Sequence, residues 1–594
     1  MFNRKTVVAI LVVGLFVVSA GFAQTLEDNW NDFLHYTAIG RLDLAKAYAQ
    51  VILDSNPDPV ALLALSKDNP QGYRILLRII EKGRDAELVE LSRKVQDIIK
   101  LGIYIRRSDP KIIVEEIKRL SSKSPRGRLT AIKRLQDAGE YAIPYMLDAV
   151  VELSNKEEFD KIVEALPEIG RDAIRPLAAA LQTENVAIKG EIIKALGGIG
   201  YSQSLGYLKY IIEKDESEAL RKLAVQSIRQ IDPSALKIPA AELFHRLAED
   251  YYYHAESLAP AEDANFANIW FWDSAGQRLE RKEVDKSYFN ELMSMRVCEW
   301  ALKADAGFGQ AIGLWVAAYF KAESAKVRMP DYFDAGHADA MTYATTAGPE
   351  YLHQALARAV KDKNAFVALG VVEALATTAG EKSLLYRLGI AQPLVQALSF
   401  DDKPVRYSAA IAIAAAGPKE AFAESKLVIE NLAQALAETE ENVDLTNEWV
   451  ATSYAVRAAR VMLKLAQTRN RVIDLSAAQG ALVNATKDKR PEIQILSGRI
   501  LAHLDSPRAQ RSIAEMALAE TNNIDVRIAA FDSLAVSAKL NANLLNNEAI
   551  DAIYGLVSSQ EADQELRSAA ASAYGALNLP SQKVKDLILD QAKS

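Results

Sequence analysis

The sequence predicts an all-α protein, an α-solenoid in which helical hairpins stack along the chain. Half of its 594 residues are hydrophobic, whereas only 28 are Gly and 19 are Pro, which is typical of a chain made mainly of helices. A short phrase recurs, with an aliphatic residue, Arg and, three positions after the Arg, Ala; such internal repetition indicates stacked units. The chain is also longer than one hydrophobic core usually supports, so an array or several domains is expected.

The recurring phrase is predicted to lie early in four helices. Its copies occupy residues 220–224, 405–409, 526–530 and 566–570. Residues about 3.6 positions apart share a helix face, so the aliphatic residue and the Ala should face inward and the Arg should lie on the rim. A hairpin with such a face can bury it only against its neighbours, and this predicts stacking.

Residues 1–24 have the pattern of an export signal. Arg4 and Lys5 precede an apolar run over residues 7–18, and small residues that include Ala23 follow it. We expect cleavage after Ala23, which makes residues 1–23 a signal peptide and gives a periplasmic or other extracytoplasmic location. An uncleaved anchor is the alternative, although the run is short for a bilayer span of about 20 residues. No later segment is predicted to span a membrane.

Residues 24–123 are predicted to form helical hairpins. Tyr36, Gly40, Ala45 and Pro57 have the spacing of a tetratricopeptide (TPR) hairpin. In such a hairpin, small residues let two antiparallel helices approach closely and Pro ends the second helix. The resemblance covers one repeat, and we interpret the whole segment as a TPR-like helical region.

A second type of unit fills residues 124–236. Gly139, Gly170 and Gly200 follow one another at intervals of 31 and 30 residues, and Asp232 comes 32 residues later. Gly can end the first helix of a hairpin because it adopts the left-handed conformation at little cost. This spacing resembles the short HEAT repeat of phycobilisome-lyase-type proteins, and the resemblance implies an α-solenoid array here.

Residues 237–348 interrupt the pattern. Bulky residues flank a Gly-containing turn within residues 268–279, which predicts one small β-hairpin. The segment around Trp300 and Trp315 resembles part of a TPR hairpin, so we interpret the region as a Trp-rich joint. Residues 349–594 then resemble HEAT or armadillo units with longer and uneven spacing.

The sequence contains few residues in patterns typical of a catalytic site, a metal site or a cofactor site. The only cysteine, Cys298, has no neighbouring His, which favours a small buried residue over a reactive thiol. The best polar cluster is Asp334, His337 and Asp339. It could bind a cation, but an Asp that caps the next helix explains it equally well. We therefore expect no enzyme activity, no cofactor and no metal.

Charge is uneven along the chain, whose formal net charge is −8. Residues 100–134 carry eleven Lys or Arg against three acidic residues, a net of +8, whereas residues 419–448 carry eight acidic residues against two lysines, a net of −6. These stretches could steer an acidic partner or join copies head to tail. The basic stretch could instead bind an anionic polymer, or both could be solvated helix faces.

Two groups of residues are candidate contacts for a partner. They are Arg106, Arg107, Lys118, Arg119, Arg126 and Arg128 of the basic stretch, and Trp270 and Trp272 of the predicted hairpin. Indole rings can receive a partner's apolar side chain, but at a domain joint they more often fill a core.

The leading hypothesis is an exported, non-enzymatic scaffold that binds protein partners on preformed helix faces, with no nucleic-acid partner expected. The alternative is a ligand-binding or hydrolytic accessory protein with its site at the central joint.

Overall fold

A computed structural model describes residues 25–152, 155–261, 264–439 and 448–580, together with Gln582, Lys585, Ile588 and Leu589. The predicted export signal lies outside these residues. The chain divides into two units: unit 1 comprises Met1–Ile238 and Ala259–Lys286, and unit 2 comprises Pro239–Leu258 and Ser287–Ser594. Each unit is a succession of packed helices, which confirms the predicted α-solenoid. No helix in the described ranges is long and apolar enough to cross a membrane.

Unit 1 contains helices α1 to α13 and one two-stranded sheet. The bounds are α1 (Leu26–Ala38), α2 (Leu42–Asp54), α3 (Pro59–Asp68), α4 (Pro70–Lys82), α5 (Ala86–Ser108), α6 (Pro110–Arg119), α7 (Pro125–Ala138), α8 (Ala142–Glu152), α9 (Lys156–Ala165), α10 (Ile174–Ala180), α11 (Val186–Ile199), α12 (Leu205–Lys214), α13 (Glu218–Ile231), β1 (Phe266–Asp273) and β2 (Arg278–Asp285). Short 3₁₀ turns join some of them, including η1 (Gly139–Tyr141) and η2 (Pro167–Ala173).

The predicted β-hairpin is confirmed and is longer than residues 268–279. β1 pairs antiparallel with β2, with Phe266 opposite Asp285 and Asp273 opposite Arg278. The sequence underestimated β2 because the strand is rich in charged residues and its apolar alternation is weak. Only Val284 of β2 is buried, so most of this strand is accessible to water.

Helix starts in unit 1 follow capping residues in the sequence. Asp58, Asn69, Asp109 and Ser124 each accept a hydrogen bond from a backbone N–H in the first turn of the helix that follows. Each is followed directly by Pro, whose missing N–H is not needed at the first helical position. These pairs therefore set where α3, α4, α6 and α7 begin.

The predicted end of the first helix at a glycine is confirmed for Gly139 and Gly200, which directly follow α7 and α11, and is wrong for Gly170. Gly139, Gly170 and Gly200 have φ angles of +59°, +76° and +80°, a region that glycine enters without strain. Asp232 takes the fourth position in an extended conformation and accepts a hydrogen bond from the Ser234 N–H. Gly139, Gly200 and Asp232 thus directly follow the first helix of a unit, whereas α9 ends at Ala165 and Gly170 lies within η2.

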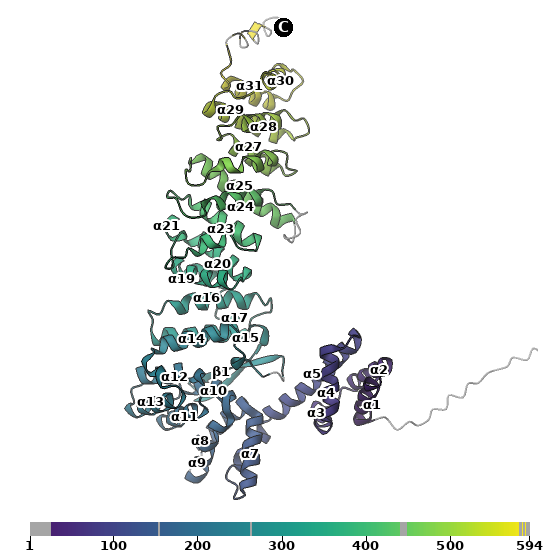
Figure 1. The fold of residues 1–594 in the computed structure, drawn as a ribbon, viewed down its shortest axis with the longest axis vertical. Coiled ribbons are helices and arrows are strands. Elements are labelled where there is room, and N and C mark those ends of the chain that lie inside the picture. Colours follow the sequence, from purple (N-terminus) through teal and green to yellow (C-terminus); the bar gives the residue numbers. More distant parts are fainter. Residues whose placement is uncertain are drawn as a thin grey trace, which may run out of the picture. The chain divides into compact units, whose positions relative to one another are not determined.

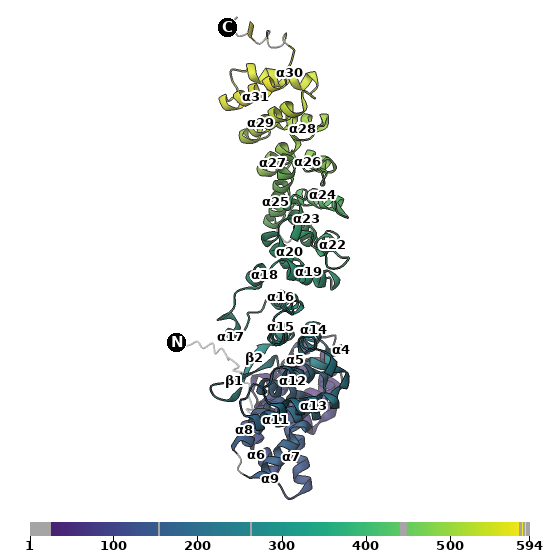
Figure 2. The same ribbon diagram turned by 90° about the vertical axis from the view of Figure 1, so that its left-hand side faces the viewer.

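Unit 2 contains helices α14 to α31, which follow one another in chain order along this unit (Figures 1 and 2). The bounds are α14 (Ala240–Tyr252), α15 (Lys286–Ala304), α16 (Gln310–Glu323), α17 (Asp331–Asp334), α18 (Ala340–Ala347), α19 (Pro349–Lys361), α20 (Ala365–Thr378), α21 (Glu381–Leu384), α22 (Pro393–Ala397), α23 (Lys403–Ala416), α24 (Ser425–Leu436), α25 (Glu448–Gln467), α26 (Gln479–Ala485), α27 (Pro491–Leu501), α28 (Pro507–Leu518), α29 (Ile524–Asn541), α30 (Asn547–Ser558) and α31 (Gln564–Ala576). Cys298 is fully buried in α15, as predicted.

The recurring phrase behaves as predicted at its apolar positions. In α23, Val405 and Ala409 are both 0% exposed, and the corresponding residues of α13, α29 and α31 are buried as well. The arginines do more than lie on the rim. Arg406 donates to the carbonyl oxygens of Phe400 and Asp401, which lie in the connection between α22 and α23. Arg221, Arg527 and Arg567 donate to the carbonyl oxygens of Asp215, Ala517 and Ser559, at the ends of α12, α28 and α30. Each of these arginines therefore binds carbonyl oxygens at the end of the preceding helix or in the connection that follows it.

Close packing between neighbouring helices of unit 2 depends on a glycine. Gly370 of α20 faces Phe320 of α16, and a Cβ atom at residue 370 would lie 2.5 Å from Cε1 of that ring. Phe320 is 3% exposed, so its ring has little room to withdraw. Gly370 thus allows α20 to approach α16.

Gly370→Ala should lower the free energy of unfolding by about 1–3 kcal/mol because the new methyl group overpacks a filled contact. The matched control is Gly555→Ala in α30, where nothing lies within 4 Å of the added Cβ. This control should be neutral or stabilising by up to about 1 kcal/mol, since Ala favours helices more than Gly. Urea unfolding followed by circular dichroism measures both variants. If both variants change the free energy of unfolding equally, the close approach of α20 to α16 at Gly370 is contradicted.

Candidate partner-binding site

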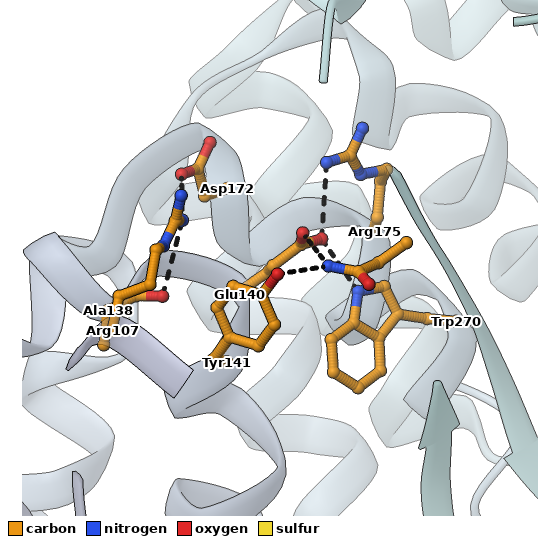
Figure 3. A network of polar contacts seen from close by, with 8 residues as sticks. Arg107, Ala138, Glu140, Tyr141, Asp172, Arg175 and Trp270 are labelled. Carbon is orange, nitrogen blue, oxygen red and sulfur yellow. Dashed lines mark hydrogen bonds and ion pairs between the residues drawn. The ribbon is translucent and has the colours of Figure 1, made fainter. Parts of the chain in front are cut away.

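A buried carboxylate holds the β-hairpin on the helices of unit 1 (Figure 3). Glu140, in η1, is 4% exposed. It accepts hydrogen bonds from the Asn268 amide at 2.6 Å and from the Trp270 indole N–H at 2.8 Å. Arg175 of α10 lies 3.3 Å from the same carboxylate and balances its charge. Because a buried carboxylate is costly without partners, these donors fix where β1 lies.

Tyr141 extends this network. Its hydroxyl accepts a hydrogen bond of 2.8 Å from Asn268. The guanidinium groups of Arg107 and Arg281 lie 5.1 Å and 4.9 Å from the centroid of its ring, within the range of cation–π attraction. Burial raises the pKa of the Tyr141 phenol to about 12, so the group stays protonated at neutral pH.

Arg107 connects this network to a cavity. Its Nη2 atom lies 3.6 Å from Asp172 Oδ2 and 3.5 Å from the Ala138 carbonyl oxygen at the end of α7. The same side chain lines a cavity of about 400 Å³ formed by residues of α3, α5, α6 and α7, which we call the α5–α7 cavity. Its wall includes Lys67, Ile103, Arg106, Arg107, Ile112, Glu115, Glu116, Arg134 and Asp137.

Glu116 is the buried carboxylate of this cavity and is 3% exposed. Its Oε1 atom lies 3.1 Å from Arg119 and 2.5 Å from Arg134. Arg119 also pairs with Glu115. The Oε2 atom of Glu116 is buried and has no hydrogen-bond donor among the residues that the structure describes. Glu116 therefore lines the cavity and keeps one oxygen whose hydrogen-bonding capacity is unused among the described residues.

Many cations of α3, α5, α6, α7 and the connection between α6 and α7 have no carboxylate partner among the described residues. Within the described ranges, no carboxylate oxygen lies within 4.0 Å of the following residues, which we call the cationic belt: Lys67, Arg106, Lys111, Lys118, Lys123, Arg126, Arg128 and Lys133. Ile105, Ile112 and Val114 are each more than one third exposed beside them. The surface of α5, α6 and α7 thus combines positive charge with accessible aliphatic groups.

The structure divides the candidate contacts into three groups. Arg106 and Arg107 line the α5–α7 cavity, and Arg119 is tied to Glu116 at its wall. Lys118, Arg126 and Arg128 do not line the cavity and belong to the cationic belt, which also includes Arg106. Their contact with a partner remains a prediction.

The two tryptophans lie elsewhere in unit 1. Trp270 is 5% exposed and donates a hydrogen bond to Glu140. It is therefore a core residue, as expected of an indole at a domain joint. Trp272 is half-buried and lines a second cavity of about 260 Å³ with Leu147 and Leu279. The structure therefore does not bring the indoles to the cavity that holds Arg106.

The polar cluster in the loop before α18 is explained by capping. Asp339 accepts a 2.8 Å hydrogen bond from the Thr342 N–H at the start of α18, and hydrogen bonding by Thr342 lowers the pKa of Asp339. His337 stacks on Phe333 with ring centroids 4.0 Å apart, and Asp334 lies 3.3 Å from Arg328. In the part of the chain that the structure covers, no three His, Cys, Asp or Glu residues are placed to hold a metal ion.

Sequence reasoning missed Lys67, Ile112 and Glu116 as residues of the site. A signal existed for Ile112, because Ile112 and Ile113 are adjacent in a short helix and only one of them can face the core. No local signal exists for Lys67, which reaches the cavity only through the packing of α3 on α5. Glu116 is one of the few acidic residues in a basic stretch, but nothing in the sequence shows that it is buried.

The class of protein follows from these features. The chain is an α-solenoid, and residues 154–229 match a family model described as HEAT repeats, which confirms the resemblance seen in the sequence. Comparison with curated proteins gives no match.

Several solved structures are similar to the chain. She4p is 12% identical, with 93% of this chain and 84% of that chain covered and a TM-score of 0.28. A microtubule polymerase with a TOG domain array is 11% identical, with 81% and 97% covered and a TM-score of 0.25. Kap121p bound to RanGTP is 12% identical with a TM-score of 0.31, and the match covers 93% of this chain and 56% of that chain.

Trp270→Phe should lower the free energy of unfolding by about 1–3 kcal/mol, because it removes one donor from the buried Glu140 carboxylate. Trp449→Phe is the control, since Trp449 is 77% exposed and its replacement should change stability by less than about 0.5 kcal/mol. Thermal unfolding followed by circular dichroism compares the two variants. If both behave alike, the carboxylate does not hold the hairpin in the way described.

Proposed function

We propose that the protein is a non-enzymatic scaffold, exported from the cytoplasm, which binds protein partners in an extracytoplasmic or cell-envelope assembly. One observation carries the proposal: the helices that form the α5–α7 cavity present exposed aliphatic side chains together with cations that have no carboxylate partner among the described residues. Exposed apolar groups rimmed by charge are typical of protein-binding surfaces.

The mechanism follows from the fold. Packed helices hold the contact surface in place before a partner arrives, so little conformational entropy is lost on binding. The cationic belt speeds the encounter with an acidic partner and sets its orientation. The pattern of residues 1–24 supports export.

Site-specific photo-crosslinking tests this function. A benzophenone amino acid is placed at Val114 of α6 or, as a control, at Leu540 of α29; these positions are 37% and 42% exposed. We expect the probe at residue 114 to crosslink a discrete protein in the extracytoplasmic fraction of cells, and the probe at residue 540 to give much less of that product.

The mass of the purified chain is measured in the same experiment, and cleavage after Ala23 is expected. If the probe at residue 114 crosslinks no protein, the proposed scaffold function is contradicted. A chain that keeps residues 1–23 and stays in the cytoplasmic fraction would contradict export alone.

A further inference from the structure

We propose that the α5–α7 cavity binds an aliphatic side chain from an acidic polypeptide segment, while the cationic belt contacts the carboxylates on either side of it. The inference rests on the proposed function and names the chemistry of the partner. It is carried by three independent features of unit 1: the aliphatic residues in the wall of the cavity, the unsatisfied oxygen of Glu116 and the positive charge of the helices that form the cavity.

The aliphatic residues in the wall of the cavity favour an apolar group in the ligand. Ile103 and Ile112 line it, and Ile112 is 38% exposed although it lies in a short helix whose other face is packed. The volume of about 400 Å³ lies within the roughly 300–1,000 Å³ of typical ligand pockets. An aliphatic side chain placed there would remove Ile112 from water.

The unsatisfied oxygen of Glu116 favours a ligand that carries a hydrogen-bond donor. Its Oε1 atom is used by Arg119 and Arg134, whereas its buried Oε2 atom has no donor in the described residues. A buried acceptor without a partner is costly, so a ligand that supplies a donor gains affinity. The main-chain N–H of a polypeptide is such a donor, and every aliphatic residue except Pro carries one beside its side chain.

The positive charge of α5 and α6 favours acidic groups in the partner. Arg106 and Lys111 belong to the cationic belt and have no carboxylate partner in the parts of the chain that are described. Carboxylates that flank the aliphatic residue would pair with them and be steered to the site.

An inorganic polyanion fits this site poorly. Polyphosphate has neither an apolar side chain for Ile112 nor an N–H group for Glu116. The cavity wall holds both signs of charge, with Glu115, Glu116 and Asp137 beside Lys67, Arg106, Arg107 and Arg134, so charge alone does not select a polyanion. Polyphosphate could therefore pair with the cations but could not make the contacts with Ile112 and Glu116 that a polypeptide makes.

The test is selection from a random-peptide display library on the full mature chain, followed by fluorescence anisotropy with the enriched peptides. We expect enriched sequences to contain Leu, Ile or Met flanked by Asp or Glu. Ile112→Ser and Arg106→Glu should each weaken binding about tenfold or more. Replacing the aliphatic residue of the peptide by Ser should weaken binding to a similar extent.

Two substitutions in unit 2 serve as matched controls. Ile524→Ser changes an Ile that is 43% exposed in α29, and Arg508→Glu reverses an exposed Arg in α28. Both should leave peptide affinity unchanged. Circular dichroism of all four variants confirms that they are folded.

Three outcomes would overturn the inference. The first is peptide binding that Ile112→Ser and Arg106→Glu leave intact; with the crosslinked partner still found at residue 114, the scaffold function would survive. The second is binding of long-chain polyphosphate with no enriched peptide. The third is self-association of the chain that Ile112→Ser abolishes, again with no enriched peptide, because a second copy would then occupy the cavity.

Discussion

Each helical hairpin of this protein depends on burying its apolar side chains against the next hairpin. Helix α29 illustrates this constraint: Phe531 is fully buried, and α29 packs against α27, α28 and α31. No single hairpin encloses a core, so stability is close to a sum of interactions between neighbours. Small residues such as Gly370 set how closely adjacent helices approach. The contact surfaces that the units offer are a consequence of this stacking.

The polar groups that recur along the chain mainly complete this stacking. Arg527 binds a carbonyl oxygen at the end of the preceding helix and Arg406 binds two in the connection before its own helix, so the arginine of the recurring phrase is a structural residue. The residues on which the proposed function rests lie outside the copies of this phrase, in the basic stretch over α5, α6 and α7. The β-hairpin also lies outside the copies, but it takes no part in the proposed binding.

The fold could be predicted from the sequence because its signals are local. Periodicity placed Val405 and Ala409 inward, and spacing identified Gly139 and Gly200 as turns. The site could be predicted only in part. The excess of basic residues pointed to Arg106, but the cavity exists only after α3, α5, α6 and α7 pack together. The role of Trp270 was equally hidden, since it is decided by Glu140, 130 positions away in the sequence.

Hydrogen exchange of the Phe531→Leu variant, read by mass spectrometry, tests the dependence between neighbours most directly. This substitution loosens one shared apolar layer, so amide exchange should become faster in α27, α28, α29 and α31 together. Helices α19 and α20, which belong to more distant layers of the same unit, should keep the exchange rates of the unchanged protein. Faster exchange confined to α29, or an equal increase throughout unit 2, would contradict a fold built from nearest-neighbour layers.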